Sequence, residues 1–106
     1  MHIDLWREKN ERGSYFIWAK IENDCLRING QDLYSAKENI FNTDEYEYIY
    51  DFDSGNTERL IHLITKNGLT TEEALLSKFG GEDGCKNLTD FCEANNIKYT
   101  FFSRFD

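Results

Sequence analysis

Residues 44–53 have the sequence DEYEYIYDFD, in which aromatic and acidic side chains alternate. A period of two is typical of a β-strand, because successive side chains of a strand point to opposite faces of the sheet. We therefore expect a strand over 44–53 that buries one face and displays carboxylates on the other. The aromatic face carries Tyr46, Tyr48, Tyr50 and Phe52, and the opposite face carries Glu45, Glu47, Asp51 and Asp53, interrupted by Ile49.

The acidic residues extend beyond this strand, since the chain has seven acidic residues and no basic one between Lys37 and Arg59. Carboxylates held at fixed spacing on a strand favour a basic partner that meets several of them in one register. The alternative is a merely solvated face, because neighbours ~7 Å apart repel by only ~0.6 kcal/mol in water. The predicted partner-binding residues are Glu45, Glu47, Asp51 and Asp53, with Asp44, Glu38 and Glu58 at the rim.

The first half of the chain favours further strands. We expect them over 3–8, 14–22 and 25–29, with the last two forming a hairpin and Gly30 ending the third. The segment 14–22 has apolar residues on both faces, which indicates a central strand. An irregular stretch follows until the tyrosine strand begins.

The second half changes to helical spacing. A first helix is expected after the turn at 54–57, and Thr70 with Glu73 is a capping-box signature for a second. Asp83 is placed to open a third helix, and alternation over 97–102 predicts a closing strand. The expected order is β-β-β-β-α-α-α-β in one α+β domain, 1–106, with a mostly antiparallel sheet of five strands. Three helices are expected to cover one face of this sheet, the face lined by the tyrosines.

Composition limits the possible partners. The chain has 106 residues and a formal net charge of −8, which disfavours nucleic acid and anionic membranes and attracts cationic partners. No apolar run approaches the ~18 residues of a membrane span, and the N-terminus lacks the pattern of a signal peptide. We expect a cytoplasmic protein, with direct nucleic-acid binding and membrane binding both absent.

The three cysteines have no metal-site spacing. Cys85 and Cys92 lie two turns apart on an expected helix, ~10 Å, which is too far for a disulfide. We expect all three, Cys25 included, to be buried thiols in a reducing compartment.

Other chemistry-bearing patterns are weak. The acidic pair of Asp51 and Asp53 fails the calcium-loop pattern, and the glycine-rich segment 80–84 contains two acids that would repel phosphate. His62 has no nucleophile beside it in sequence. We therefore predict no catalytic residue, no metal and no cofactor. Two alternatives stay open: a small carboxylate- or metal-dependent enzyme, and a generic acidic adaptor with another basic partner.

Three segments resemble small bacterial immunity proteins of polymorphic toxin systems, and contact-dependent growth inhibition immunity proteins in particular. They are GQDL at 30–33, DEYEY at 44–48, and the ending over 96–105, within a resemblance that begins near Leu26. The resemblance implies a cytoplasmic, non-enzymatic protein that binds and blocks the C-terminal toxin domain delivered by a neighbouring cell. Such toxins are commonly nucleases, many directed at tRNA, and a nuclease presents a basic surface that an acidic inhibitor can cover.

Overall fold

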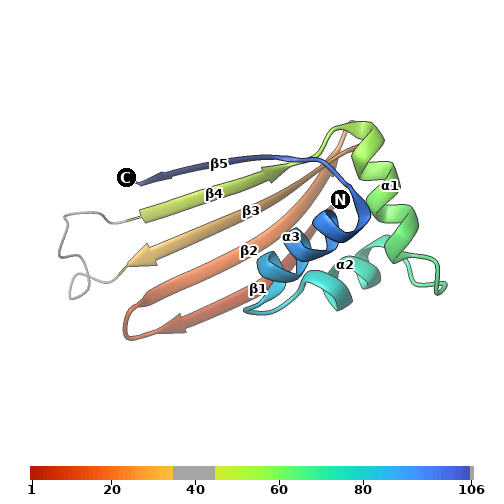
Figure 1. The fold of residues 1–106 in the computed structure, drawn as a ribbon. Helices are drawn as coiled ribbons and strands as arrows, with labels where there is room; N and C mark the ends of the chain where they lie inside the picture. The colour runs from red at the N-terminus through yellow and green to blue at the C-terminus, as the bar shows by residue number, and fades with distance from the viewer. Residues whose placement is uncertain (35–44, 106) are drawn as a thin grey trace.

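The computed structural model describes residues 1–34 and 45–105. Over these residues five strands form one antiparallel sheet in the order β1-β2-β3-β4-β5, and three helices between β4 and β5 lie on one face (Figure 1). The predicted fold class and element order are confirmed. The elements are β1 His2–Asn10, β2 Gly13–Glu22, β3 Cys25–Tyr34, β4 Glu45–Asp51, α1 Ser54–Ile64, α2 Thr71–Phe79, α3 Gly84–Asn95 and β5 Thr100–Phe105.

The β2–β3 hairpin forms as predicted, with Glu22 opposite Cys25. Asn23 and Asp24 make the turn with φ of 53° and 63°, the left-handed conformations that suit the twist of a two-residue hairpin. The prediction that Gly30 ends β3 is wrong, since the strand continues to Tyr34. A Cβ on Gly30 would overlap the ring of Tyr48 on the neighbouring strand, so this glycine makes room for an aromatic ring inside the sheet.

The core lies between the helices and one end of the sheet. Side chains from β2 and β3 alternate into it, because every second residue of a strand faces the same side. The helices cover only the part of this face near the β2–β3 turn, so the sheet extends beyond them (Figure 1). The fully buried contributors include Ala19, Leu26, Ile28, Leu60, Leu75 and Leu88.

The tyrosines of β4 lie on the helix side of the sheet, as predicted. Their register partners on β3 are Asp32, Gly30 and Ile28, and residues paired across an antiparallel ladder share a face. Tyr50 packs against the core, but Tyr46 stacks on Phe105 at 4.4 Å, and the Phe105 ring is 66% exposed. The expected cover of helices therefore does not extend over the whole aromatic row.

The helix boundaries follow from capping. Asp53, not the turn after it, is the N-cap of α1, and its carboxylate accepts from the Asn56 backbone N–H at 2.8 Å. The predicted capping box of α2 is confirmed. α3 ends at Asn96 in the left-handed conformation, and Arg59 of α1 donates to that residue's carbonyl at 3.0 Å.

The cysteines differ from one another in burial. All are free thiols, but only Cys92 is buried, while Cys85 is partly buried and Cys25 is exposed. The prediction of three buried thiols is therefore wrong for Cys25 and only partly right for Cys85. Cys25 begins β3 and follows the hairpin turn, where no helix covers it.

Across the described ranges, no helix has the length and apolar character needed to span a membrane.

Candidate functional site

The predicted acidic row occupies the sheet face that the helices leave uncovered, which we call the open face. Glu45, Glu47 and Asp51 pair with Leu33, Gln31 and Arg27 of β3, whose side chains share this face. Asp53 lies beyond the end of β4 and caps α1 instead. Glu38 and Asp44 lie outside the described residues. The alternation therefore places three of the four strand carboxylates as predicted.

These carboxylates already have partners within the chain. Arg27 binds Asp51 through two hydrogen bonds, Nε to Oδ1 at 2.7 Å and Nη2 to Oδ2 at 3.1 Å. Arg104 of β5 donates to Glu47 Oε2 at 2.9 Å. Both Asp51 oxygens already accept from a guanidinium, so a partner's cation must displace Arg27 to reach this carboxylate. The row is internally neutralised at two of its positions.

Glu45 and Asp53 are engaged by neutral groups. The Gln31 side-chain amide donates to the Glu45 carboxylate, and this hydrogen bond lowers the pKa of Glu45. Backbone and side-chain donors of Asn56 lower the pKa of Asp53. Both carboxylates are thus held in the charged form by local hydrogen bonds.

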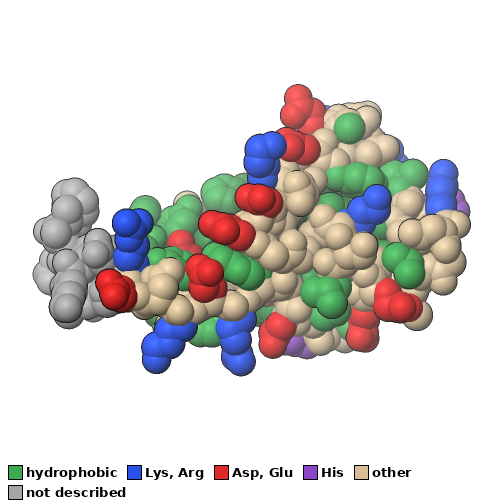
Figure 2. Space-filling model, turned by 90° about the horizontal axis from the view of Figure 1, so that it is seen from below, with side chains coloured by type: hydrophobic (Ala, Val, Ile, Leu, Met, Phe, Trp, Pro, Cys, Tyr) green, Lys and Arg blue, Asp and Glu red, His purple; other side chains and the backbone are tan. Residues whose placement is uncertain are grey.

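The open face mixes rings with ion pairs. Phe16, Trp18 and Phe102 lie on it, and the guanidinium of Arg7 sits 5.4 Å from the centre of the Phe16 ring. Figure 2, which views the molecule from the β1 side, shows acidic and basic side chains interspersed along that side. Among described residues the register puts five acids on this face (Asp4, Glu22, Glu45, Glu47, Asp51) and five bases (Arg7, Lys9, Lys20, Arg27, Arg104), so the negative excess of the chain lies elsewhere.

At the middle of the open face a buried amide lacks a partner. Asn29 is only 9% exposed, and its Nδ2 donates no hydrogen bond within the described residues. It lines a hollow of about 340 Å³ together with Trp18 and the Arg27–Asp51 pair. An unpaired buried donor costs free energy, and an acceptor from a bound molecule would satisfy it.

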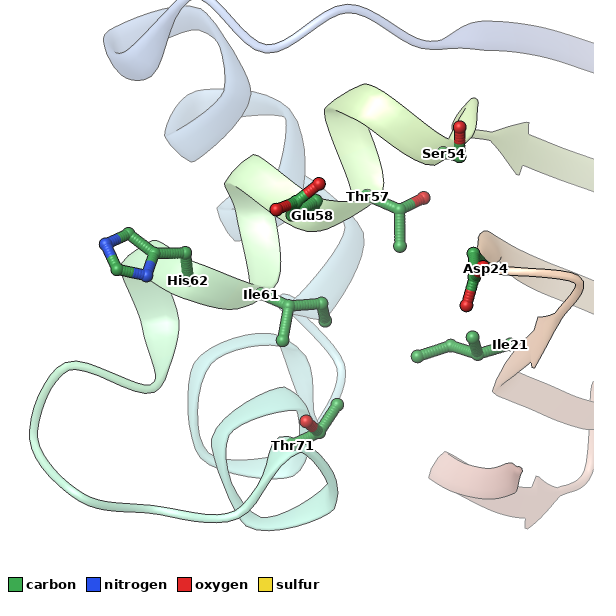
Figure 3. Close-up of a pocket in the computed structure, with 8 residues that line it drawn as sticks. All are labelled: Ile21, Asp24, Ser54, Thr57, Glu58, Ile61, His62 and Thr71. Carbon is green, nitrogen blue, oxygen red and sulfur yellow. The ribbon is translucent and has the colours of Figure 1, made fainter.

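A second hollow, of about 650 Å³, lies on the other side of the β2–β3 turn, and we call it the α1 hollow. In Figure 3, Ile21 and Ile61 point toward one another across it, while the His62 ring points away. Neither Asp24 nor Glu58, which also line it, forms an ion pair with any described residue. The lining residues are Ile21, Asp24, Ser54, Thr57, Glu58, Ile61, His62 and Thr71.

Buried hydrogen bonds fix the position of α1 beside the turn. Thr57 is 5% exposed, and its Oγ1 accepts from the Leu26 backbone N–H at 2.9 Å. Thr57 is the residue before Glu58, and Leu26 is the second residue after Asp24 of the turn. This bond therefore holds Glu58 at the same hollow as Asp24.

Glu58 is a predicted partner-binding residue, whereas Asp24 and Asn29 are not among the predicted ones. Asp24 belongs to a recognisable hairpin turn, but the sequence does not indicate which helix meets that turn. Nothing in the sequence around Asn29 distinguishes it from other strand residues. Its burial arises from its neighbours on β2 and β4. The sequence therefore predicts the hairpin turn that contains Asp24, but it does not predict the burial of the Asn29 amide.

Burial keeps two of the thiols and one phenol in their neutral forms. Burial raises the pKa of Cys85 and of Cys92 to about 11, and it raises the pKa of Tyr50 to about 12. A thiol with such a pKa is protonated at neutral pH and reacts slowly.

No His, Cys, Asp or Glu side chains of the described segments form a group of three suited to a metal ion. Asp51 and Asp53 have separate partners, Arg27 and Asn56.

No protein-family model, curated protein or solved structure matches this chain.

Proposed function

We propose that this protein is a cytoplasmic immunity protein that binds and neutralises a cognate toxin domain. In this proposal the α1 hollow receives a lysine or arginine side chain of the toxin. The support comes from the resemblance of the sequence to immunity proteins, the net charge of −8, and the geometry of the hollow.

The observation that carries the proposal is the pair of carboxylates at the α1 hollow, neither of which forms an ion pair with a residue that the structure describes. Ile21 and Ile61 form its apolar part, while Asp24 and Glu58 supply negative charge. Lysine and arginine have an apolar stem and a charged head, so they match a site that combines these two surfaces. A partner cation meets these carboxylates without first displacing a cation from the described part of the chain.

The open face contributes a second contact in the same proposal. The turn residues Asn23 and Asp24 line the two hollows on either side of the hairpin, so one partner can contact both. A backbone carbonyl of the toxin would accept from Asn29 Nδ2, and the ring of Trp18 would supply buried area. Aromatic and arginine side chains are enriched at the centres of protein interfaces.

A nuclease toxin is the partner class that fits best. An enzyme that binds phosphates displays lysine and arginine side chains, and an inhibitor with the opposite charge associates with it quickly. We expect the association rate to fall steeply with added salt, since most of the net charge is exposed to solvent.

Co-expression tests this role. The candidate toxin is the C-terminal domain encoded by the adjacent upstream reading frame, because immunity genes of this type follow their toxin genes. We expect that domain to arrest growth alone and to be harmless when this protein is co-expressed. Arrest in the presence of the folded protein would refute the immunity role.

Charge reversal tests the binding site. The double variant Asp24→Lys, Glu58→Lys should weaken toxin binding by about 2 kcal/mol or more in a calorimetric titration, since it removes both carboxylates from a desolvated contact. Glu82→Lys with Glu93→Lys is the matched control, because it changes the net charge equally at exposed positions outside the hollow. Equal losses for both double variants would show that net charge alone matters.

The rival enzyme and adaptor functions give different results. A carboxylate site for calcium, magnesium or manganese would raise the melting temperature when the ion is added, and we expect no such change. An adaptor would bind a basic protein other than the adjacent gene product and would not rescue growth.

A further inference from the structure

The β5 strand forms an edge of the sheet with exposed aromatic rings. It pairs only with β4 among the described elements, and all six of its residues are exposed. The exposed fractions are 51% for Phe101, 57% for Phe102 and 66% for Phe105. An extended edge with apolar side chains is a template for pairing with another strand.

The opposite edge, β1, is protected from such pairing. Its register with β2 shifts between Asp4 and Trp6, and such a bulge interrupts the regular ladder. Its middle is also anchored, since the Leu5 carbonyl accepts from the Gly81 N–H at 2.9 Å. Ionisable side chains occupy most of its other positions, namely His2, Asp4, Arg7, Glu8 and Lys9. By contrast, β5 carries one charged residue, Arg104, and its register with β4 has no shift.

We propose that β5 pairs antiparallel with β5 of a second copy of this chain, with the two Ser103 residues opposite each other. Residues that pair across an antiparallel ladder share a face. When β5 pairs with itself, even-numbered residues must therefore lie opposite even-numbered ones, and odd-numbered residues opposite odd-numbered ones. The Ser103-centred register places Phe101 opposite Phe105 and Phe102 opposite Arg104. Every exposed ring of the strand then meets a ring or a guanidinium.

The neighbouring register, centred on Phe102, is less complementary. It places Phe101 opposite Ser103 and moves Phe105 opposite Tyr99, which precedes β5 and packs against Tyr50 and Phe52. The ring of Phe105 would then lie beyond the paired strands. The side chains of the strand itself therefore favour Ser103 as the centre.

The proposed dimer has a two-fold axis perpendicular to the sheet. Such an axis joins the two sheets into one of ten strands, with the helices of both copies on the same side. The α1 hollow lies at the β2–β3 turn and not at the outer edge of β5, so the dimer leaves it accessible. A six-residue edge is a small contact compared with the ~1,200 Å² of standard interfaces, so we expect a weak, concentration-dependent dimer.

Sedimentation velocity over a wide concentration range tests the pairing. We expect the wild-type protein to move from monomer towards dimer as its concentration rises. Phe102→Lys should raise the dissociation constant by at least about tenfold, because it places a cation opposite Arg104 of the other copy. Leu76→Lys is the matched control: Leu76 is 49% exposed on α2, away from the edge, and its replacement should leave the dimer intact.

Two further variants test the register. In the Ser103-centred register, Phe102→Glu puts a carboxylate opposite Arg104 of the other copy, so we expect dimerisation to be retained. In the Phe102-centred register the same change would put two carboxylates opposite each other and weaken the dimer. In a Cys25→Ser background, Ser103→Cys should form a disulfide dimer on mild oxidation, while Asn10→Cys on the β1 edge should not. Circular dichroism checks that each variant is folded.

Several results would overturn the proposal. A wild-type protein that stays monomeric at every concentration would show that the edge does not pair with itself, whether or not a strand of another protein uses it. A dimer unaffected by Phe102→Lys would place the contact elsewhere. Loss of dimerisation in the folded Phe102→Glu variant would refute the Ser103-centred register.

Discussion

The acidic row of β4 and the α1 hollow both present carboxylates, but the two regions differ in what those carboxylates contact. In the row, Asp51 is bound by Arg27 and Glu47 by Arg104. At the hollow, Asp24 and Glu58 have no ion pair with any residue that the structure describes. The density of acidic residues in the sequence therefore does not show which charges are available to a partner.

The difference arises from the pairing of strands. Arg27 and Arg104 lie 24 and 57 residues away in sequence from the carboxylates that they bind. The register of the sheet brings each arginine opposite its acid, whereas the hairpin turn and α1 bring two acids to one apolar hollow.

The largest effect on stability is expected at the wall of the hollow. Thr57→Val removes the buried acceptor of the Leu26 N–H, and an unsatisfied buried donor costs about 1–3 kcal/mol. Thr100→Val changes an exposed threonine beside the row, opposite Asp51, and should alter the free energy of unfolding by no more than about 0.5 kcal/mol. Urea denaturation of both variants measures the contrast, and similar losses would contradict it.

The next effect is a pH dependence at Asp53, which joins the row to α1. Its hydrogen bonds from Asn56 lower its pKa in the folded state. A carboxylate whose pKa is lowered by folding stabilises the fold fully at pH values above the ordinary aspartate pKa of about 3.9. This contribution disappears as the pH falls through the folded-state pKa. Asp53→Asn keeps a capping acceptor that does not titrate. We expect the melting temperature of the wild type to fall relative to this variant below about pH 4; parallel curves would argue against it.

A smaller effect is expected from the ion pair of the row. A double-mutant cycle on Arg27 and Asp51, each changed to alanine, should give a coupling below about 1 kcal/mol, since both side chains are roughly half exposed. The coupling should shrink further in high salt. A coupling that stays above about 2 kcal/mol in high salt would contradict the expectation of a weak, solvent-screened pair.

The smallest effect on stability is expected at the carboxylates of the hollow. Asp24→Asn and Glu58→Gln keep shape and remove charge, and neither residue has an ion pair to lose within residues 1–34 and 45–105. Each should change the free energy of unfolding by no more than about 0.5 kcal/mol, although both should weaken toxin binding. A large loss of stability in either variant would indicate a structural role for that carboxylate.

Local patterns predicted much of this fold. The alternation over 44–53 located β4 and its two faces, and Thr70 with Glu73 located the start of α2. The continuation of β3 through Gly30 was not predictable, because it depends on the Tyr48 ring of another strand. The partners of the acidic row and the burial of Asn29 depend on register in the same way.

Isoleucine methyl groups offer the most direct test of where a toxin binds. Ile21 and Ile61 line the α1 hollow, and Ile49 lies within the acidic row on the open face. Methyl NMR spectra recorded during a titration with the toxin domain compare the two regions in one sample. Ile49 pairs with Asn29, the proposed second contact, so its signal can also change. We predict that the signals of Ile21 and Ile61 shift or broaden more than that of Ile49. A perturbed Ile49 with unchanged Ile21 and Ile61 would place the partner on the row and contradict the account.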